Sequence, residues 1–166
     1  MPNRNLSKIF IQTLEQAVDS VVVIDSRNQV ILFNRSAEQL WGLPRQKVIG
    51  HNVSILVPPD IRADHDGYIE ANRRTGINKI VGSSRTLHIQ RPDGSRRWAS
   101  MSISKIEADD EVLYTAFIKD ITEQHQQDEK LRLVSLVVDR TDSAIMIIDG
   151  EWRTLYVNDG FNRLLG

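Results

Sequence analysis

The alternation of apolar and polar positions over residues 1–122 predicts a sheet interrupted by helices. Two β-branched runs at 21–24 and 30–33 flank a polar turn, which is typical of a β-hairpin. Three further strands are expected at 79–90, 96–106 and 112–118, from their apolar content and from the polar turns between them. Strands separated by short turns pair with antiparallel neighbours, so the sequence predicts a five-stranded antiparallel sheet.

Helices are predicted where the apolar period lengthens from two to between three and four. Residues 6–17 and 122–136 form N-terminal and C-terminal flanking helices, and a long helix covers 60–74. Ser36 is expected to cap a short helix that ends at Gly42, with two further short segments at 44–48 and 52–56. Together these elements predict an α+β fold, with helices on one face of the sheet and a flanking helix at each end.

Residues 20–42 and 144–166 carry the same pattern of apolar runs, turn and helix without a gap. Asn34 matches Asn158, which sets the offset at 158 − 34 = 124 residues. The repeat predicts an N-terminal flanking helix at 1–19, one complete module at 20–122 and a linker helix at 123–137. Residues 138–166 are then expected to be the truncated start of a second module, so the chain is expected to be a piece of a longer protein.

Composition restricts the classes of function. The formal net charge of −1 provides no field for nucleic acid or for an anionic membrane. The absence of cysteine excludes disulfides and thiolate metal ligands. No apolar run approaches the roughly 20 residues that a membrane-spanning helix requires. We therefore expect a cytoplasmic location, with no nucleic-acid partner and no membrane contact by this part of the protein.

Histidine is the first candidate for site chemistry. His65 is the only histidine of the predicted 60–74 helix, and Ile61, Tyr68, Ile69 and Asn72 share its helical face. Neutral imidazole is a strong metal ligand, although an exposed histidine on a helix surface is the competing interpretation.

The other histidines are weaker candidates. His51 follows a glycine in a loop and His125 lies beside polar residues, so both are expected to be solvated. His88 lies three residues past Arg85 in a predicted strand, and strand alternation directs it to the opposite face.

The arrangement resembles a PAS domain over about residues 8–122. The resemblance rests on the hairpin and helix that carry Asn34, on the turn at 91–95 and on the segment at 119–123 that closes the last strand. A narrower resemblance, over 62–69 and 80–85, is to the haem-binding PAS domains of the FixL and DosP oxygen-sensor families. That resemblance implies haem b as the cofactor and His65 as the proximal iron ligand. It also implies that Arg85, at 85 − 65 = 20 residues further on, faces the gas.

The same resemblance implies the lining of the pocket. Tyr68, Ile69 and Asn72 would contact the cofactor from the helix, and Ile80, Gly82, Ser83, Met101 and Ile103 from the strands. Ser83 stands where the DosP type has a methionine as second axial ligand, so a five-coordinate ferrous state is expected. Trp98 is interpreted as an ordinary core residue.

The resemblance implies a haem-based gas sensor without catalysis of its own, which regulates a linked output. Dioxygen is the expected ligand, with carbon monoxide and nitric oxide as further candidates, and the flanking helices are expected to form a homodimer. The output would be cyclic-di-GMP turnover or a histidine kinase. The alternatives are a PAS domain that binds a flavin or a small metabolite, and a ligand-free dimerisation module. A blue-light flavin photoadduct is excluded because its chemistry requires a cysteine.

Overall fold

A computed structural model describes residues 3–75, 82–108, 111–141 and 143–165. Within these ranges the side chains of residues 3–7, 63, 68, 72–75, 108 and 165 are not described. The chain divides into two compact units, Met1–Thr122 and Glu123–Gly166, and each unit is considered by itself below.

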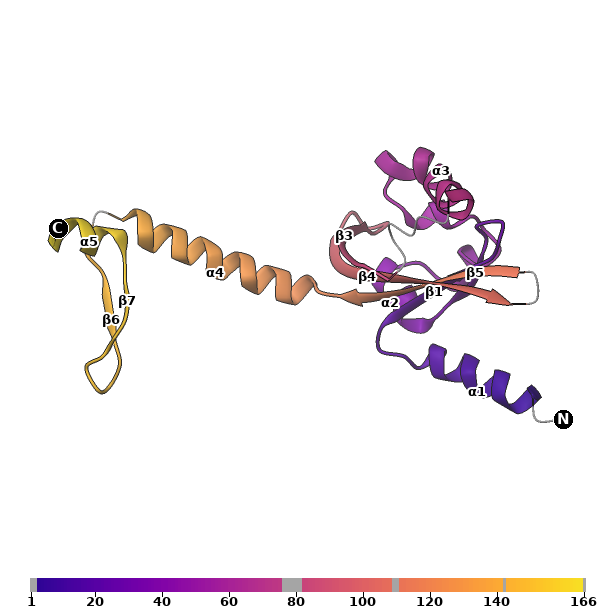
Figure 1. Ribbon diagram of the computed structural model, residues 1–166, viewed down its shortest axis with the longest axis horizontal. Coiled ribbons are helices and arrows are strands. Elements are labelled where there is room, and N and C mark those ends of the chain that lie inside the picture. The colour runs from indigo at the N-terminus through magenta and orange to yellow at the C-terminus, as the bar shows by residue number, and fades with distance from the viewer. Residues whose placement is uncertain (1–2, 76–81, 109–110, 142, 166) are drawn as a thin grey trace. The chain divides into compact units, whose positions relative to one another are not determined.

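The first unit is built on a five-stranded antiparallel sheet, as the apolar pattern predicts (Figure 1). The strands lie in the order β2-β1-β5-β4-β3, so the first hairpin pairs with the last strand of the unit. Their bounds are β1 Ser20–Ile24, β2 Val30–Phe33, β3 Ser84–Gln90, β4 Arg96–Ala108 and β5 Glu111–Asp120. The strand expected at 79–90 thus begins at Ser84 in the described part of the chain, and residues 79–81 lie outside it.

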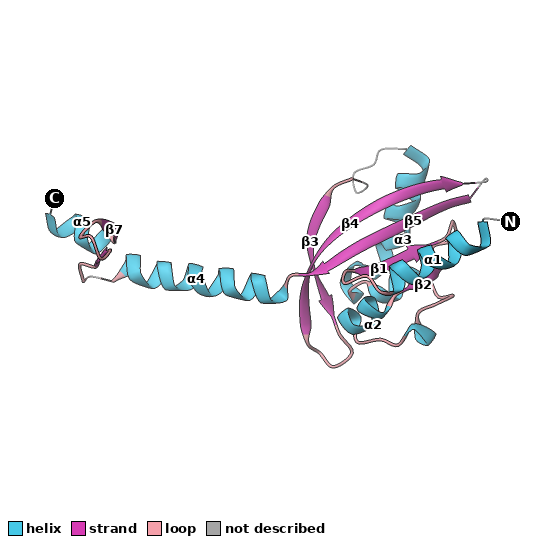
Figure 2. Cartoon of the chain, turned by 90° about the horizontal axis from the view of Figure 1, so that it is seen from below, coloured by secondary structure: helices cyan, strands magenta, loops and turns pink. Residues whose placement is uncertain are grey.

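Helices connect the second and third strands and flank the unit. Their bounds are α1 Asn3–Glu15, α2 Arg35–Trp41, η1 Arg45–Lys47, η2 Val53–Leu56, α3 Pro59–Thr75 and α4 Thr122–Arg140, of which η1 and η2 are 3₁₀ turns. In both views α3 lies on one side of the sheet and α1 on the other (Figures 1 and 2). None of the helices in the described ranges is long and apolar enough to cross a lipid bilayer.

The core lies between α2, η2 and one face of the sheet. The buried residues of this cluster include Val22, Ile24, Phe33, Ala37, Leu40, Trp41, Leu56, Ile89, Ala99, Tyr114 and Ile118. Phe33 and Trp41 pack with ring centroids 5.7 Å apart, within the range of favourable aromatic pairs. Burying one large apolar side chain contributes about 1.5–3 kcal/mol, so this cluster is the main source of stability.

Asn34 organises the junction of β1, β2 and α2. Its Oδ1 accepts hydrogen bonds from the backbone N–H groups of Val21 at 2.9 Å and Ala37 at 3.0 Å. Its Nδ2 donates to the carbonyls of Leu14 at 2.8 Å and Asp19 at 3.1 Å. The helix cap is therefore Asn34 and not Ser36, so that prediction was wrong.

Ser36 lies too far into the helix to cap it. Its hydroxyl donates instead to the carbonyl of Ala17 at 2.6 Å, in the segment before β1. Serine and asparagine are both favoured caps, and the distinction depends on where the strand ends.

The second unit repeats this junction with different neighbours. Its elements are the C-terminal part of α4, β6 Met146–Ile148, β7 Thr154–Val157 and α5 Asp159–Leu165. Asn158 accepts from the N–H groups of Ile145 and Phe161 and donates to the carbonyls of Val138 and Ser143. Each partner lies 124 positions after its counterpart around Asn34, so the sequence repeat corresponds to a repeated hydrogen-bond network.

The hairpin turns repeat as well. Asp25 and Asp149 each accept two backbone N–H groups of their own turns, at 2.8 and 2.9 Å. The left-handed position of the turn is Asn28 in the first unit, with φ +62°, and Trp152 in the second, with φ +65°. The turn therefore forms with either side chain, and Asn28 is not required for its geometry.

Candidate functional site

The sheet face that packs against the core brings Arg85 and Met101 together. Arg85 pairs directly with Met101 in the β3–β4 ladder, and Met101 pairs with Ile118 in the β4–β5 ladder. Directly opposed residues of antiparallel strands project to the same face, and so do residues two apart. Arg85, Met101 and Ile103 therefore share one face, and Leu87 continues it along β3.

His65 lies on α3 four residues before Ile69, and Ile69 packs against the core cluster. Residues four apart share a helix face, so His65 projects from the side of α3 that faces the core. The side chain is half-buried, and its Nδ1 atom is buried without a hydrogen-bond partner. A buried ring nitrogen without a partner costs free energy, which a hydrogen bond to Nδ1 or a group bound to the ring would recover.

Burial also determines the protonation state of His65. Removal of the ring from water lowers the pKa of His65 below its ordinary value of 6.5, and the nearby Asp66 carboxylate opposes this with a smaller effect. The neutral imidazole is therefore favoured near pH 7, and this is the form that binds metals.

The remaining predicted cofactor contacts are only partly described. Gly82 adopts φ +81° in the turn before β3, and its N–H donates to the carbonyl of Ile103 at 3.1 Å. This hydrogen bond holds the turn that carries Ser83 against β4, and Ser83 itself is exposed. Tyr68 and Asn72 lie in α3, but their side chains, like the whole of Ile80, lie outside the described part of the chain.

His88 lies on the other face of the sheet, as strand alternation predicts. Its ring meets Trp98 edge-on, with centroids 6.2 Å apart, and the two residues pair directly in the β3–β4 ladder. Trp98 is therefore not a core residue, and that prediction was wrong. Its position differs in parity from Met101 and Ile103, so it projects away from the core.

Asp66, directly after His65, makes long-range contacts that the sequence does not indicate. Its Oδ1 accepts from Nδ2 of Asn28 at 2.8 Å, and both of its carboxylate oxygens accept from Nδ2 of Asn52 at 3.2 and 3.1 Å. The contacts with Asn28 and Asn52 span 38 and 14 residues of sequence, so no local spacing indicates them. The only local signal is the position of Asp66 directly after His65.

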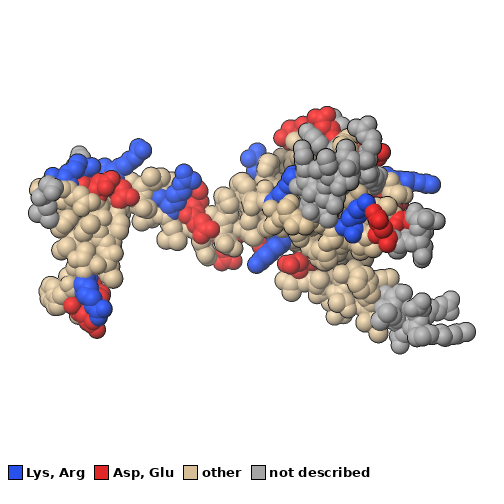
Figure 3. Space-filling view, in the orientation of Figure 1, with Lys and Arg blue, Asp and Glu red and all other residues tan. Residues whose placement is uncertain are grey.

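The described charged side chains on the surface of the first unit do not gather around the candidate site. Over the face of the first unit shown in Figure 3, acidic and basic side chains are interspersed with uncharged surface among the described residues. This distribution agrees with the formal net charge of −1. The net charge thus provides no long-range field around His65 or Arg85.

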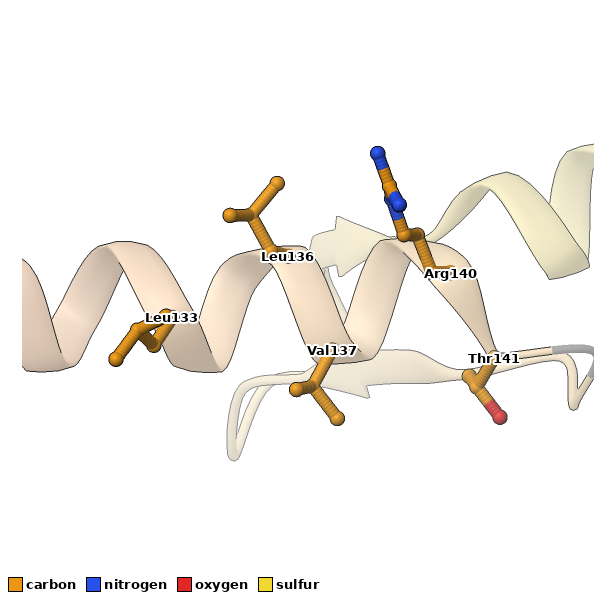
Figure 4. Close-up of a pocket in the computed structure, with 5 residues that line it drawn as sticks. All are labelled: Leu133, Leu136, Val137, Arg140 and Thr141. Atoms are coloured by element: carbon orange, nitrogen blue, oxygen red, sulfur yellow. The ribbon is translucent and has the colours of Figure 1, made fainter.

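A second feature lies in the other unit. A hollow of about 540 Å³ is lined by Leu133, Leu136, Val137, Arg140 and Thr141, all from α4 or the residue after it (Figure 4). Leu133 and Val137 are 55% and 70% exposed. Exposed apolar residues at helical spacing are typical of a helix that packs against another helix.

The fold and the sequence define the class of the protein. A PAS-domain family model matches residues 18–123 and a second PAS-domain model matches residues 129–166, so the chain belongs to the PAS domain family. Solved structures agree. The PAS domain of a protein from Colwellia psychrerythraea aligns with a TM-score of 0.57 and 21% identity, over 71% of this chain and 98% of that one. The PAS domain of an HTR-like protein from Haloarcula marismortui gives a TM-score of 0.55 and 17% identity, over 71% and 93%.

Two sensor proteins are more similar in sequence. The oxygen sensor protein DosP of Escherichia coli is 35% identical over 158 residues, which cover 95% of this chain and 20% of DosP. The sensor protein FixL of Bradyrhizobium diazoefficiens is 35% identical over 114 residues, which cover 69% of this chain and 23% of FixL. The chain thus spans about a fifth of the length of these relatives.

Proposed function

We propose that the first unit binds haem b through His65 and senses dioxygen. The observation that carries the proposal is His65 itself, a half-buried imidazole on the core-facing side of α3 with a buried, unpartnered Nδ1. Similarity to DosP and FixL supports the same function. When bound, haem iron would supply a coordination position for a diatomic gas.

The described residues fit a flat apolar cofactor. Ile69 on α3 and Leu87, Met101 and Ile103 on the strands are partly buried apolar side chains at the edge of the core cluster. Apolar side chains of this kind would hold the macrocycle, and the lowered pKa of His65 keeps its imidazole neutral, the form that binds iron. Tyr68, Asn72, Ile80, Gly82 and Ser83 complete the proposed lining.

Arg85 is the proposed gas-binding residue. It projects from the same sheet face as Met101, and its guanidinium carries several N–H donors on a positive charge. With haem in place, Arg85 would donate a charge-assisted hydrogen bond to dioxygen, which takes on negative charge at the iron. Carbon monoxide takes on much less charge and would gain less from the same donor. This difference favours dioxygen, with carbon monoxide and nitric oxide as further ligands.

We also propose how the chain divides. A flanking helix at 1–19, the sensor domain at 20–122, a linker helix at 123–137 and the beginning of a second PAS domain at 138–166 account for the two units and for both family matches. The sensor would act in the cytoplasm within a larger signalling protein whose output is cyclic-di-GMP turnover or a histidine kinase.

Homodimerisation through the flanking helices is part of the same proposal. Phe10 on α1 is 62% exposed, and its neighbours Ile9 and Ile11 are exposed as well. On α4 the exposed apolar residues include Leu133 and Val137. A second copy that covers these side chains would remove their apolar surface from water. Such burial stabilises a dimer by about 25 cal/mol for each Å² of apolar surface.

Titration of the purified chain with haem tests the function. A saturable Soret band at one haem per chain is expected, with a reversible shift of that band when dioxygen is added to the reduced protein. A chain that takes up flavin and no haem would support a flavin-binding PAS domain. A chain that takes up neither would support a ligand-free dimerisation module, and both results contradict the proposal.

A further inference from the structure

We infer that Asp66 is a positioning residue, which holds α3 in the rotation that directs His65 into the haem site. The inference rests on the proposed function and adds a residue whose role no spacing in the sequence indicates. The feature that carries it is a carboxylate that joins α3 to two other segments of the first unit.

The partners of Asp66 are themselves fixed in place. Asn28 is buried in the β1–β2 turn, and its carbonyl accepts from the N–H of Val53 at 2.9 Å. Asn52 caps η2, since its Oδ1 accepts from the N–H of Ser54 at 2.7 Å, and its Nδ2 remains for Asp66. Asp66 therefore binds two amides that are held by segments outside α3.

The geometry of a helix converts this contact into a constraint on His65. Adjacent helix residues point about 100° apart, so the direction of the Asp66 side chain fixes that of His65. Arg62, four residues before Asp66, donates to the carbonyls of Val57 at 3.1 Å and Ile55 at 3.4 Å and holds the same side of the helix. Hydrogen bonds on this side and Ile69 against the core together determine how α3 is rotated.

The second unit shows that the left-handed turn at Asn28 and the contact of Asn28 with Asp66 are independent features. Its hairpin places Trp152 at the position of Asn28, with nearly the same φ, and Trp152 is 84% exposed. The left-handed turn thus forms without asparagine. In the first unit, the Asn28 amide serves the contact with Asp66.

The test compares Asp66→Ala with Asp64→Ala. Both carboxylates are exposed on the same helix, but the hydrogen bonds with Asn28 and Asn52 are made by Asp66. In the haem-free chain, Asp66→Ala should speed amide hydrogen exchange along α3. In the haem titration it should weaken binding by about 10- to 100-fold, which is the usual effect of removing a residue that orients a metal-binding histidine. Asp64→Ala should change neither. Asp66→Asn, which keeps one acceptor oxygen, should fall between wild type and Asp66→Ala.

A second background distinguishes positioning from general support of the pocket. In His65→Gly, dissolved imidazole can replace the missing ring without attachment to α3. Asp66→Ala should then leave haem affinity unchanged, because the ligand no longer depends on helix rotation. An equal loss of affinity in both backgrounds would overturn the inference, as would unchanged exchange along α3. A wild-type chain that takes up no haem overturns the proposed function, and amide exchange then reports separately whether Asp66 holds α3.

Discussion

His65 connects burial with protonation at the scale of a single side chain. Burial lowers the pKa of His65 in the folded chain, whereas the unfolded chain keeps the ordinary value of 6.5. Between these two values the unfolded state binds more protons, so the free energy of unfolding must rise with pH. Below the folded-state pKa both states are protonated, and this dependence ends.

The haem-free chain should therefore lose stability as the pH falls from above 6.5 into the window below it. His65→Gln should remove this part of the pH dependence while leaving the contributions of other groups. Urea unfolding of both proteins at several pH values measures the effect. Parallel stability curves for the two proteins would show that burial does not penalise the charged ring.

Asn34 offers a second test at this scale. Asn34→Ala removes a helix cap, which costs about 1 kcal/mol, and leaves buried backbone groups unsatisfied at about 1–3 kcal/mol. We expect a loss of about 2–4 kcal/mol for the first unit, measured by chemical denaturation. Asn34→Asp keeps the acceptor oxygen but faces two carbonyls without a donor, so it should also destabilise.

The matched control is Asn158→Ala, which removes the same network from the second unit. It should leave the main unfolding transition of the first unit in place. Equal effects of the two alanine variants on that transition would contradict the division into separate units.

Individual residues are the least predictable feature of the chain. Ser36 and Asn34 are both acceptable caps, and only the end of β2 at Phe33 decides between them. Trp98 is apolar and suits a core by composition, but the register places it opposite His88 on the other face. Asp66 contacts partners far away in sequence, which composition and spacing cannot reveal.

Secondary structure is more predictable, because the apolar period records which face of each element is buried. The β3–β4 ladder carries two residues of the proposed site. It places Arg85 directly opposite Met101, so a substitution in either strand acts on one shared surface. The separation of 20 residues between His65 and Arg85 indicates a site only once α3 and β3 are known to border the same core.

Arg85→Ala should weaken dioxygen binding by the haem-loaded chain. A hydrogen bond to a charged donor contributes about 1.5–3 kcal/mol, which corresponds to about 10- to 150-fold in affinity. Carbon monoxide affinity should change much less, and the dioxygen dissociation rate should carry most of the loss. Stopped-flow measurement with both gases provides the comparison. Equal losses for the two gases would show that Arg85 shapes the pocket without discriminating between ligands.

Met101→Leu should leave the visible spectrum of the reduced, gas-free protein unchanged. Met101 packs against the core cluster between Arg85 and Ile118, so its expected role is to fill volume. Similar volumes make the exchange of methionine for leucine mild, at less than about 1.5 kcal/mol. A single broad visible band is expected in both proteins. Sharp split bands that disappear in the variant would assign Met101 as an axial ligand.

At the scale of the whole molecule, the same asparagine-centred hydrogen-bond network occurs twice. The networks around Asn34 and Asn158 match partner by partner at a constant offset, and the amino-acid pattern alone is sufficient to predict this repeat. The long-range contacts of Asp66 occur in the first copy, and no pattern in the amino-acid sequence indicates them. Asn28 binds Asp66 in that copy, whereas Trp152 occupies the equivalent position of the second unit in an exposed setting.

The most direct test of the account is haem binding by His65→Ala, with His51→Ala as the control, since His51 is exposed in a loop. His65→Ala should lose haem or bind it far more weakly, while far-UV circular dichroism remains native because the core cluster does not include His65. His51→Ala should bind like wild type. Full haem binding with an unshifted spectrum in His65→Ala would contradict the account, because the proposed iron ligand would then be a different residue.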